Sequence, residues 1–263
     1  MVAEPHVELR DVHMAFGDRV VFERLSCAFP RGKISVILGG SGSGKSTILR
    51  LIGGLVHPVS GRVLVAGQDV TRLSERQLFE VRKKLGMLFQ GGALLDSMTV
   101  FENVAFPLRE HTRHSPAEVA RIVHARLESV GLKNVDDLLP GQLSGGMLKR
   151  AALARAIVLE PEILLCDEPF SGLDPVSVRT IEALFHDINA RSAITMVVVS
   201  HHIASTMRFA EHVLLLLPDG PVQGTPDALR RSADPRVVAF LSEEYAASPP
   251  RLVPSGAAPA PAR

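Results

Sequence analysis

Residues 39–47 read Gly-Gly-Ser-Gly-Ser-Gly-Lys-Ser-Thr, and no other stretch constrains the fold as strongly. An apolar run at 34–38 precedes this stretch, and a helical pattern at 48–52 follows it. Glycines at these spacings let successive backbone N–H groups turn toward an anion, and the start of the helix adds its positive dipole end. Strand, glycine-rich loop and helix in this order are typical of a phosphate-binding loop. The sequence therefore predicts a nucleoside triphosphate site, in preference to a glycine-rich surface loop.

Each position of this loop has an expected role toward the triphosphate. Lys45 would reach the β- and γ-phosphates, and the hydroxyl of Ser46 would ligate Mg²⁺. The backbone of the loop would cradle the phosphates. The residues predicted to bind the nucleotide in this segment are Gly39, Gly40, Ser41, Gly42, Ser43, Gly44, Lys45, Ser46 and Thr47.

Composition limits the classes of protein to which the chain can belong. Its 263 residues fit one large α/β domain, or a domain with a subdomain, and 46% apolar residues supply a sizeable core. A net charge of +1 gives no reason to expect a nucleic-acid partner. Cys27 and Cys166 lie in apolar runs, so we expect them to pack as small hydrophobic residues rather than to pair.

The sequence shows no feature that would place the chain in a membrane by itself. Its strongly apolar runs, such as 213–217, are far shorter than a membrane span. Residues 1–6 lack a basic region followed by an apolar core, so no signal peptide is expected. Any membrane role is therefore expected to come through a partner.

Strands and helices are predicted to alternate along most of the chain. Strands are expected at 7–12, 19–29, 34–38, 62–66, 85–89, 163–166, 194–199 and 212–217. Helices are expected from 48 to about 53, at 74–83, 176–190 and 203–209, and as two short pieces within 225–242. The nearly all-apolar late strands favour an α/β core with a buried, mostly parallel sheet, accompanied by an antiparallel β part.

The pattern becomes helical between about residues 91 and 160. Helical pieces are expected near 100–109, 116–130 and 146–158. We interpret this stretch as a helical subdomain inserted into the core, within one domain that covers 1–245. Residues 246–263 are rich in Ala, Pro and Ser, so we expect a disordered tail, which is either inert or reaches a neighbouring subunit.

Two carboxylates, Asp167 and Glu168, follow the apolar strand at 163–166. Functional groups collect at the carboxyl ends of the strands in an open α/β sheet. Neighbouring side chains on an extended strand point in opposite directions, so the two can take different roles. Asp167 would hold Mg²⁺, and Glu168 would polarise the attacking water as a general base. Taken alone, the pair could equally cap a helix; the phosphate-binding loop upstream favours the catalytic interpretation.

A histidine closes the next apolar strand. His201 would lie on the same rim of the sheet, where its imidazole could hydrogen-bond the γ-phosphate and the attacking water. It could also be no more than a polar strand end, but its position one strand after the acidic pair favours a function. His202 lacks that support, and we interpret it as structural.

A second loop that leads into a helix, Leu-Ser-Gly-Gly-Met at 143–147, could also bind phosphate. One triphosphate does not need two such loops from one chain. This segment and the motifs above, in their order and spacing, resemble the ATP-binding cassette (ABC) ATPases, and the resemblance covers about residues 7–240. The segment at 143–147 matches the signature of that family. The signature of one subunit closes over the nucleotide held by its partner. The resemblance implies a P-loop NTPase core of the ABC type, ATP and Mg²⁺ as ligands, ATP hydrolysis, and a homodimer.

The resemblance also assigns roles to individual residues. Phe16 falls where the family stacks an aromatic ring on adenine, and Gln90 falls where its glutamine senses Mg²⁺ and the attacking water. The signature residues expected to bind the partner's ATP are Ser144, Gly145 and Gly146. The predicted catalytic residues are Glu168, His201, Gln90 and Lys45, and the predicted metal ligands are Ser46, Gln90 and Asp167. Residues 171–174 match the segment that couples the two sites.

Three positions depart from the usual pattern of the family. Met147 stands where glutamine is usual, His202 where aspartate is usual, and Phe16 where tyrosine is commoner. None of the three removes a ligand of phosphate or metal, or the general base. ATP hydrolysis is therefore expected to persist.

Residues 87–111, the signature form with Met147, and residues 234–241 resemble one branch of the family. This Mla branch moves phospholipid between the inner and outer bacterial membranes. The resemblance implies a homodimer on two copies of an MlaE-like permease, with an MlaD-like substrate-binding subunit and a small MlaB-like accessory subunit. It also implies a location on the cytoplasmic face of the inner membrane, held there by the permease.

Two alternatives stay open within the family. The chain could serve an importer or exporter of another substrate, or it could be a soluble ABC ATPase with no transport role. The soluble classes generally carry two cassettes or a long coiled-coil insertion, and the sequence has neither. A self-sufficient P-loop kinase would have no reason for the segment at 143–147.

Overall fold

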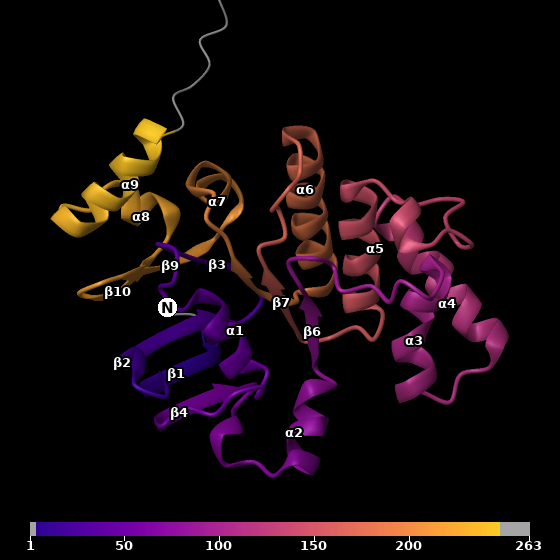
Figure 1. The fold of residues 1–263 in the computed structure, drawn as a ribbon, viewed down its shortest axis with the longest axis horizontal. Coiled ribbons are helices and arrows are strands. Elements are labelled where there is room, and N and C mark those ends of the chain that lie inside the picture. The colour runs from indigo at the N-terminus through magenta and orange to yellow at the C-terminus, as the bar shows by residue number, and fades with distance from the viewer. Residues whose placement is uncertain (1–3, 248–263) are drawn as a thin grey trace, which may run out of the picture.

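Two β-sheets lie at the centre of the computed structural model, which describes residues 4–247 (Figure 1). The first sheet is antiparallel, with the strand order β2-β1-β4-β5. Its strands are β1 (Pro5–Phe16), β2 (Arg19–Pro30), β4 (Ser60–Val65) and β5 (Gln68–Asp69). The hairpin from β1 to β2 turns at Gly17, which has a positive φ of 57°, and it leaves Phe16 paired with Arg19.

The second sheet has six strands in the order β10-β9-β3-β8-β7-β6. These are β3 (Ile34–Gly39), β6 (Leu85–Leu88), β7 (Ile163–Asp167), β8 (Thr195–Val199), β9 (His212–Leu217) and β10 (Gly220–Gly224). All neighbouring pairs are parallel except β9 and β10. The carboxyl ends of β3, β6, β7 and β8 therefore lie along one edge of the sheet, which gathers the segments that follow them.

Helices cover both faces of this parallel sheet. They are α1 (Lys45–Ile52), α2 (Glu75–Arg82), α3 (Val100–His111), α4 (Pro116–Ser129), α5 (Gly145–Ile157), α6 (Pro175–Ser192), α7 (Ile203–Phe209), α8 (Pro226–Arg230) and α9 (Pro235–Ala247). In Figure 1, α6 and α7 lie above the sheet, whereas α1 and the antiparallel sheet lie below it. No helix within residues 4–247 combines the length and the apolar character that a bilayer crossing requires.

Alternation along the parallel strands divides the buried residues between two cores. On β8, Met196 and Val198 point into the core under α6 and α7, whereas Val197 and Val199 point into the core against α1 and the antiparallel sheet. Both faces of each central strand are thus buried, which explains why these strands read as continuous apolar runs. The free cysteines Cys27 and Cys166 are buried in these cores, as predicted.

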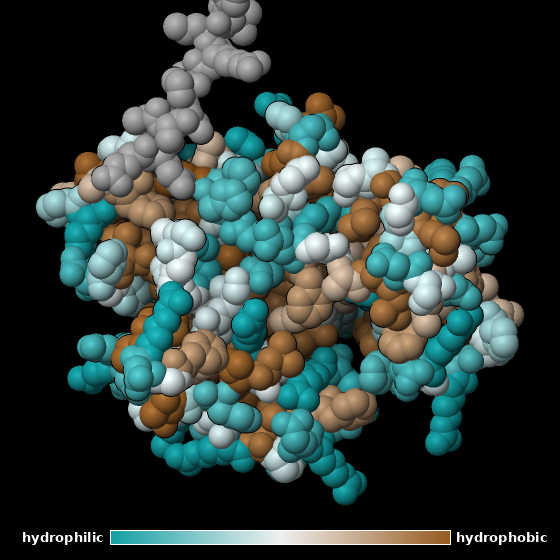
Figure 2. Space-filling model, in the orientation of Figure 1, coloured by the Kyte–Doolittle hydropathy of each residue, from teal (hydrophilic) through white to brown (hydrophobic). Residues whose placement is uncertain are grey.

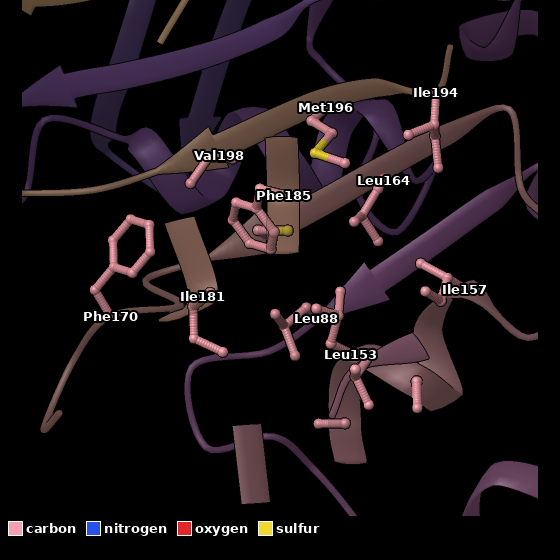
Figure 3. Close-up of a cluster of buried hydrophobic side chains, with 14 of the residues drawn as sticks. Leu88, Leu153, Ile157, Leu164, Phe170, Ile181, Phe185, Ile194, Met196 and Val198 are labelled. Atoms are coloured by element: carbon pink, nitrogen blue, oxygen red, sulfur yellow. The ribbon is translucent and has the colours of Figure 1, made fainter. Parts of the chain in front are cut away.

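An aromatic cluster fixes the segment that leaves β7. Phe170 lies with its ring centroid 6.0 Å from that of Phe185 on α6 and 5.4 Å from that of Phe209 on α7. Figure 3 shows Phe170 and Phe185 near Ile181 and Val198 in this cluster. Because Phe170 follows Glu168 by two residues, this packing holds the backbone that carries the acidic pair.

Three helices, α3, α4 and α5, pack on one another within the stretch 91–160, at the right of Figure 1. Asn103 on α3 is fully buried, and its amide nitrogen donates to the carbonyl oxygens of Leu95, Met98 and Thr99, in the segment that precedes the helix. The apolar residues Val100, Val104 and Leu108 form the inner face of α3. This packing supports our interpretation of the stretch as a helical subdomain.

The mostly parallel α/β core and the antiparallel part confirm the predicted fold class. Two short strands, β5 and β10, were not expected from the sequence. Strand β10 contains two glycines and Pro221, which lack the apolar pattern of a strand. A proline is tolerated there because β10 is the edge of its sheet. The predicted tail at 246–263 lies, from residue 248 on, outside the described residues.

The aromatic cluster yields a test of stability. Phe185 is completely buried, so Phe185→Ala should lower the free energy of unfolding by about 3–5 kcal/mol, through lost burial and a cavity. Val238→Ala, at a position where the side chain is 49% exposed, should change it by less than about 0.5 kcal/mol. Urea denaturation followed by circular dichroism measures both; equal effects would contradict the packing described here.

Candidate functional site

The loop after β3 forms a glycine-lined cradle. Gly42 and Gly44 have positive φ values of 77° and 93°. A Cβ on Gly44 would lie 2.5 Å from Cζ of Phe22 and 2.7 Å from Cγ1 of Val21, so no other residue fits without a shift of β2. The ammonium of Lys45 donates to the carbonyl oxygens of Gly39, at 2.8 Å, and Gly40, at 2.9 Å. A positive charge is thus held at the mouth of a loop that leads into the N-terminus of α1.

The hydroxyl of Ser46 donates a hydrogen bond of 2.9 Å to Oδ1 of Asp167. This bond joins the loop after β3 to the carboxyl end of β7. A hydroxyl and a carboxylate are oxygen donors of the kind that Mg²⁺ prefers, so the two residues fit the predicted metal role. No group of three or more His, Cys, Asp or Glu side chains in residues 4–247 could hold a metal by itself. A metal here would need further oxygen ligands, which a triphosphate has.

Glu168 and His201 are in direct contact. Nδ1 of His201 lies 2.7 Å from Oε2 of Glu168. Glu168 adopts a positive φ of 48°, which is costly for a residue with a side chain, and its backbone N–H donates to the carbonyl oxygen of Val199 at 3.1 Å. The carboxylate is 15% exposed and the imidazole 52% exposed. The predicted base, Glu168, is therefore partly desolvated and oriented by His201.

His202 stacks beside His201, with ring centroids 4.1 Å apart. Burial lowers the pKa of His202 below its ordinary value, and the positive charge of a protonated His201 would lower this pKa further. His202 therefore favours the neutral form and adds no charge to the site. This is consistent with its interpretation as structural.

A cavity of about 460 Å³ brings most of the predicted residues together. It is lined by Phe16, Arg19, Val21, Ser41, Gly42, Gly44, Lys45, Ser46, Thr47, Gln90, Glu168 and His201. Nε2 of Gln90 also lies 3.4 Å from Oγ of Ser171, in the segment that follows the acidic pair. A larger cavity of about 1010 Å³ lies beside residues 40–43 but contains neither Lys45 nor Glu168, so the smaller one is the candidate site.

The signature residues are not among those that line this cavity. Ser144 caps α5 by accepting a hydrogen bond of 3.3 Å from the backbone N–H of Met147. Gly146 packs against α6, where an added Cβ would lie 2.9 Å from Oγ of Ser177. The structure therefore separates the signature of the chain from its own phosphate-binding loop.

Sequence reasoning missed two charged residues near the site. Arg19 lines the cavity because the β1–β2 hairpin pairs it with Phe16, a relation that follows from the tight turn at Gly17. Lys149 is buried on α5, and burial lowers its pKa, whereas the negative charges of Glu168 and Asp167 raise it. Helical spacing could have indicated the burial of Lys149, because the buried Leu153 follows it by four residues and lies on the same face of the helix.

Comparison with known proteins gives a consistent result. Residues 22–171 match the family model described as ABC transporter. The chain belongs to the ABC transporter family. It is 45% identical over 240 residues to the intermembrane phospholipid transport system ATP-binding protein MlaF of Haemophilus influenzae, an alignment that covers 90% of each chain. It is 41% identical to the probable ribonucleotide transport ATP-binding protein mkl of Mycobacterium leprae, over 90% of this chain and 68% of that protein.

Solved structures extend this relation to three dimensions. The dimeric bacterial ABC transporter cassette MJ0796 superposes with a TM-score of 0.77 at 30% identity, covering 84% of this chain and 98% of that one. The same cassette is known as a dimer in a post-hydrolysis state with ADP and Pi bound. The prediction of an ATP-binding, ATP-hydrolysing ABC subunit is therefore confirmed, whereas the roles of individual residues stay predictions.

The contact between Glu168 and His201 yields the second test. Glu168→Gln removes the base but keeps the shape of the side chain, so hydrolysis should fall at least about 100-fold while ATP binding persists. The ATP-bound variant should accumulate as a dimer on size-exclusion chromatography. Glu160→Gln, at a position where the side chain is 84% exposed, is the matched control and should behave as the parent. Hydrolysis by Glu168→Gln at the parent rate would show that Glu168 is not the base.

Proposed function

We propose that the chain is the ATPase subunit of a transporter that moves phospholipid between the inner and outer bacterial membranes. The observation that carries this proposal is the 45% identity to MlaF over 90% of both chains. Such coverage spans both the nucleotide site and the helical stretch at 91–160. Phospholipid would be handled by the membrane subunits, and this chain would supply the work of ATP hydrolysis.

The chain acts in this proposal as a homodimer with two composite sites. Support comes from the separation of the two phosphate-binding elements within one chain. The phosphate-binding loop lines the cavity, whereas Ser144 to Gly146 lie outside it. Residues 171–174, which match the family's segment that couples the two sites, end in Asp174, the N-cap of α6. Val176, in the first turn of α6, has 75% of its surface exposed. An exposed valine beside an ordered helix cap is suited to contact with a second copy.

Most residues of the cavity have a task in hydrolysis. Phe16 stacks on the adenine ring, and the loop amides with Lys45 bind the phosphates. Ser46, Asp167 and Gln90 would hold Mg²⁺, which would neutralise charge on the phosphates. Glu168 accepts a proton from the attacking water, because its carboxylate is oriented by His201 and lies on the rim of the cavity. Ser144, Gly145 and Gly146 of the partner complete the binding of ATP.

A groove between β6, α2 and α3 is the proposed docking site for the permease. Its volume is about 400 Å³, and its apolar lining includes Phe79, Met87, Phe89 and Pro107. Phe79 and Phe89 are 47% and 42% exposed, although both are large and apolar. Figure 2 shows a hollow on this face, at the place that Figure 1 gives to β6, α2 and α3. A short amphipathic segment of an MlaE-like permease fits this chemistry.

Docking there would hold the chain peripherally on the cytoplasmic face of the inner membrane. The MlaD-like and MlaB-like subunits would then join through the same assembly. The similarity to mkl, whose name states ribonucleotide transport, supplies the rival substrate class. The identity to MlaF is higher than that to mkl, and the alignment covers a larger share of MlaF than of mkl, which favours phospholipid as the substrate.

Affinity capture distinguishes these substrates. Tagged full-length chain, purified from native membranes in mild detergent, should recover a permease together with phospholipid. Phe89→Asp places a charge in the apolar groove and should reduce recovery of the permease at least about tenfold. Val238→Asp, on the exposed face of α9, should not reduce it. Recovery of only a nucleotide, sugar or amino-acid permease would overturn the phospholipid assignment.

A further inference from the structure

Lys149 is the most deeply buried lysine in residues 4–247, with 5% of its surface exposed. It lies on α5, one turn after the signature glycines. Burial of an ammonium is costly unless its charge and its N–H groups are satisfied. The Nζ of Lys149 donates a hydrogen bond to the backbone carbonyl oxygen of Gln90, and the negative charges of Asp167 and Glu168 favour its charged form. This lysine therefore has a specific partner, Gln90, in the proposed nucleotide site.

A second cation on α5 holds the same loop. Arg155 donates from Nη1 to the carbonyl oxygen of Ala93, at 2.7 Å, and from Nη2 to that of Gly92, at 3.0 Å. Lys149 and Arg155 lie six residues apart on α5, and together they satisfy three carbonyl groups of residues 90–93. These groups carry partial negative charge, so both cations are well matched to them.

Packing reinforces these hydrogen bonds. Gly92 has a positive φ of 78°, and an added Cβ would lie 2.6 Å from Cδ2 of Leu148 and 3.4 Å from Cβ of Ala152. Both neighbours belong to α5. Residues 90–93 thus pack closely against α5 at Gly92, between the hydrogen bonds from Lys149 and Arg155, and their backbone is held by this helix.

The side chain of Gln90 points the other way, toward the nucleotide site. It lines the cavity with Lys45 and Glu168, and its Nε2 lies 3.4 Å from Oγ of Ser171. The backbone carbonyl of Gln90 is therefore held by α5, whereas its side-chain amide lies in the cavity with Lys45 and Glu168. Any displacement of α5 relative to the core would move this amide.

We propose that Lys149 is a positioning residue that fixes Gln90 to the signature helix. Because α5 begins with the signature, movement of Ser144 and Gly146 onto a partner's nucleotide would also move Gln90 within the chain's own site. One helix then couples the two sites of a dimer. This inference rests on the dimeric function proposed above.

A double-mutant cycle tests the proposal on the purified full-length chain. Lys149→Met keeps the length of the side chain but removes its charge and donors, so kcat for ATP should fall about 10- to 100-fold through misplacement of Gln90. The KM for ATP should change by less than about threefold, since the phosphate-binding loop is untouched. If Lys149 acts through Gln90, adding Lys149→Met to Gln90→Ala should lower kcat by no more than a further factor of about three.

Two conservative changes separate positioning from general destabilisation. Lys149→Arg keeps a charge and donors and should recover kcat to within about threefold of the parent. If Lys149→Met does not fold, Lys149→Gln, which keeps a donor without the charge, takes its place in the cycle. Lys133→Met, at an exposed lysine that pairs with Glu128, is the matched control and should leave kcat unchanged.

Additive losses in the cycle would overturn the proposal, because they would show that Lys149 acts independently of Gln90. A fall in kcat for Lys149→Arg as large as for Lys149→Met would also overturn it. Failure of the proposed dimeric function would give a different result. Glu168→Gln would then show no ATP-dependent dimer, while the effects of Lys149→Met and Gln90→Ala on kcat could still be coupled within one chain.

Discussion

The parallel pairing of β3, β8 and β7 is the constraint on which the rest of the molecule depends. Val199 on β8 is paired with Ile37 on β3 and with Asp167 on β7. Beyond this register, the backbone N–H of Ser200 donates to Ile37 and that of Glu168 donates to Val199. Strands β7 and β8 therefore end level with each other, and β3 ends two residues further along, at Gly39. The phosphate-binding loop, the acidic pair and the histidine meet because the strands that carry them stop at the same edge.

This arrangement places left-handed backbone conformations at two points of the site. Gly44 takes a left-handed conformation against Phe22, and Glu168 takes one with a side chain attached. The surrounding register and the aromatic cluster of Phe170, Phe185 and Phe209 hold these segments in place. Stability from burial in two apolar cores thus offsets local strain at the carboxyl edge of the sheet.

Helix α5 connects the signature to the loop that carries Gln90. Its first turn carries the signature, and its buried face holds the loop of Gln90 through Lys149 and Arg155. A groove formed by α2, β6 and α3 opens next to this loop, with Phe89 on its wall. A permease seated in the groove would contact the segment that leads directly into Gln90. Lipid transport, signature closure and hydrolysis would then act on one short stretch of chain.

Much of this site follows from local sequence. The phosphate-binding loop, the acidic pair and His201 are each marked by a short motif at the end of an apolar strand, and strand order brings them together. Contacts that depend on tertiary packing were not foreseen. Lysine on a helix is usually solvated, and the burial of Lys149 depends on the packing of α5 against residues 90–93. Its spacing from Leu153 indicates the buried face of the helix but not the contact with Gln90. Strand β10 was missed because its glycines and Pro221 hide the pattern of an edge strand.

In the proposed dimer, each nucleotide site is shared between two copies of the chain. Lys45→Ala destroys the phosphate-binding loop, and Gly145→Asp places a charge in the signature, where an added Cβ meets only Leu173 at 3.6 Å. Each variant alone should be inactive. ATPase activity of an equimolar mixture is the most direct measurement. Because half of randomly formed dimers pair the two variants and contain one intact site, the mixture should regain up to about a quarter of the parent activity. A mixture no more active than the mean of the two variants would contradict the shared site.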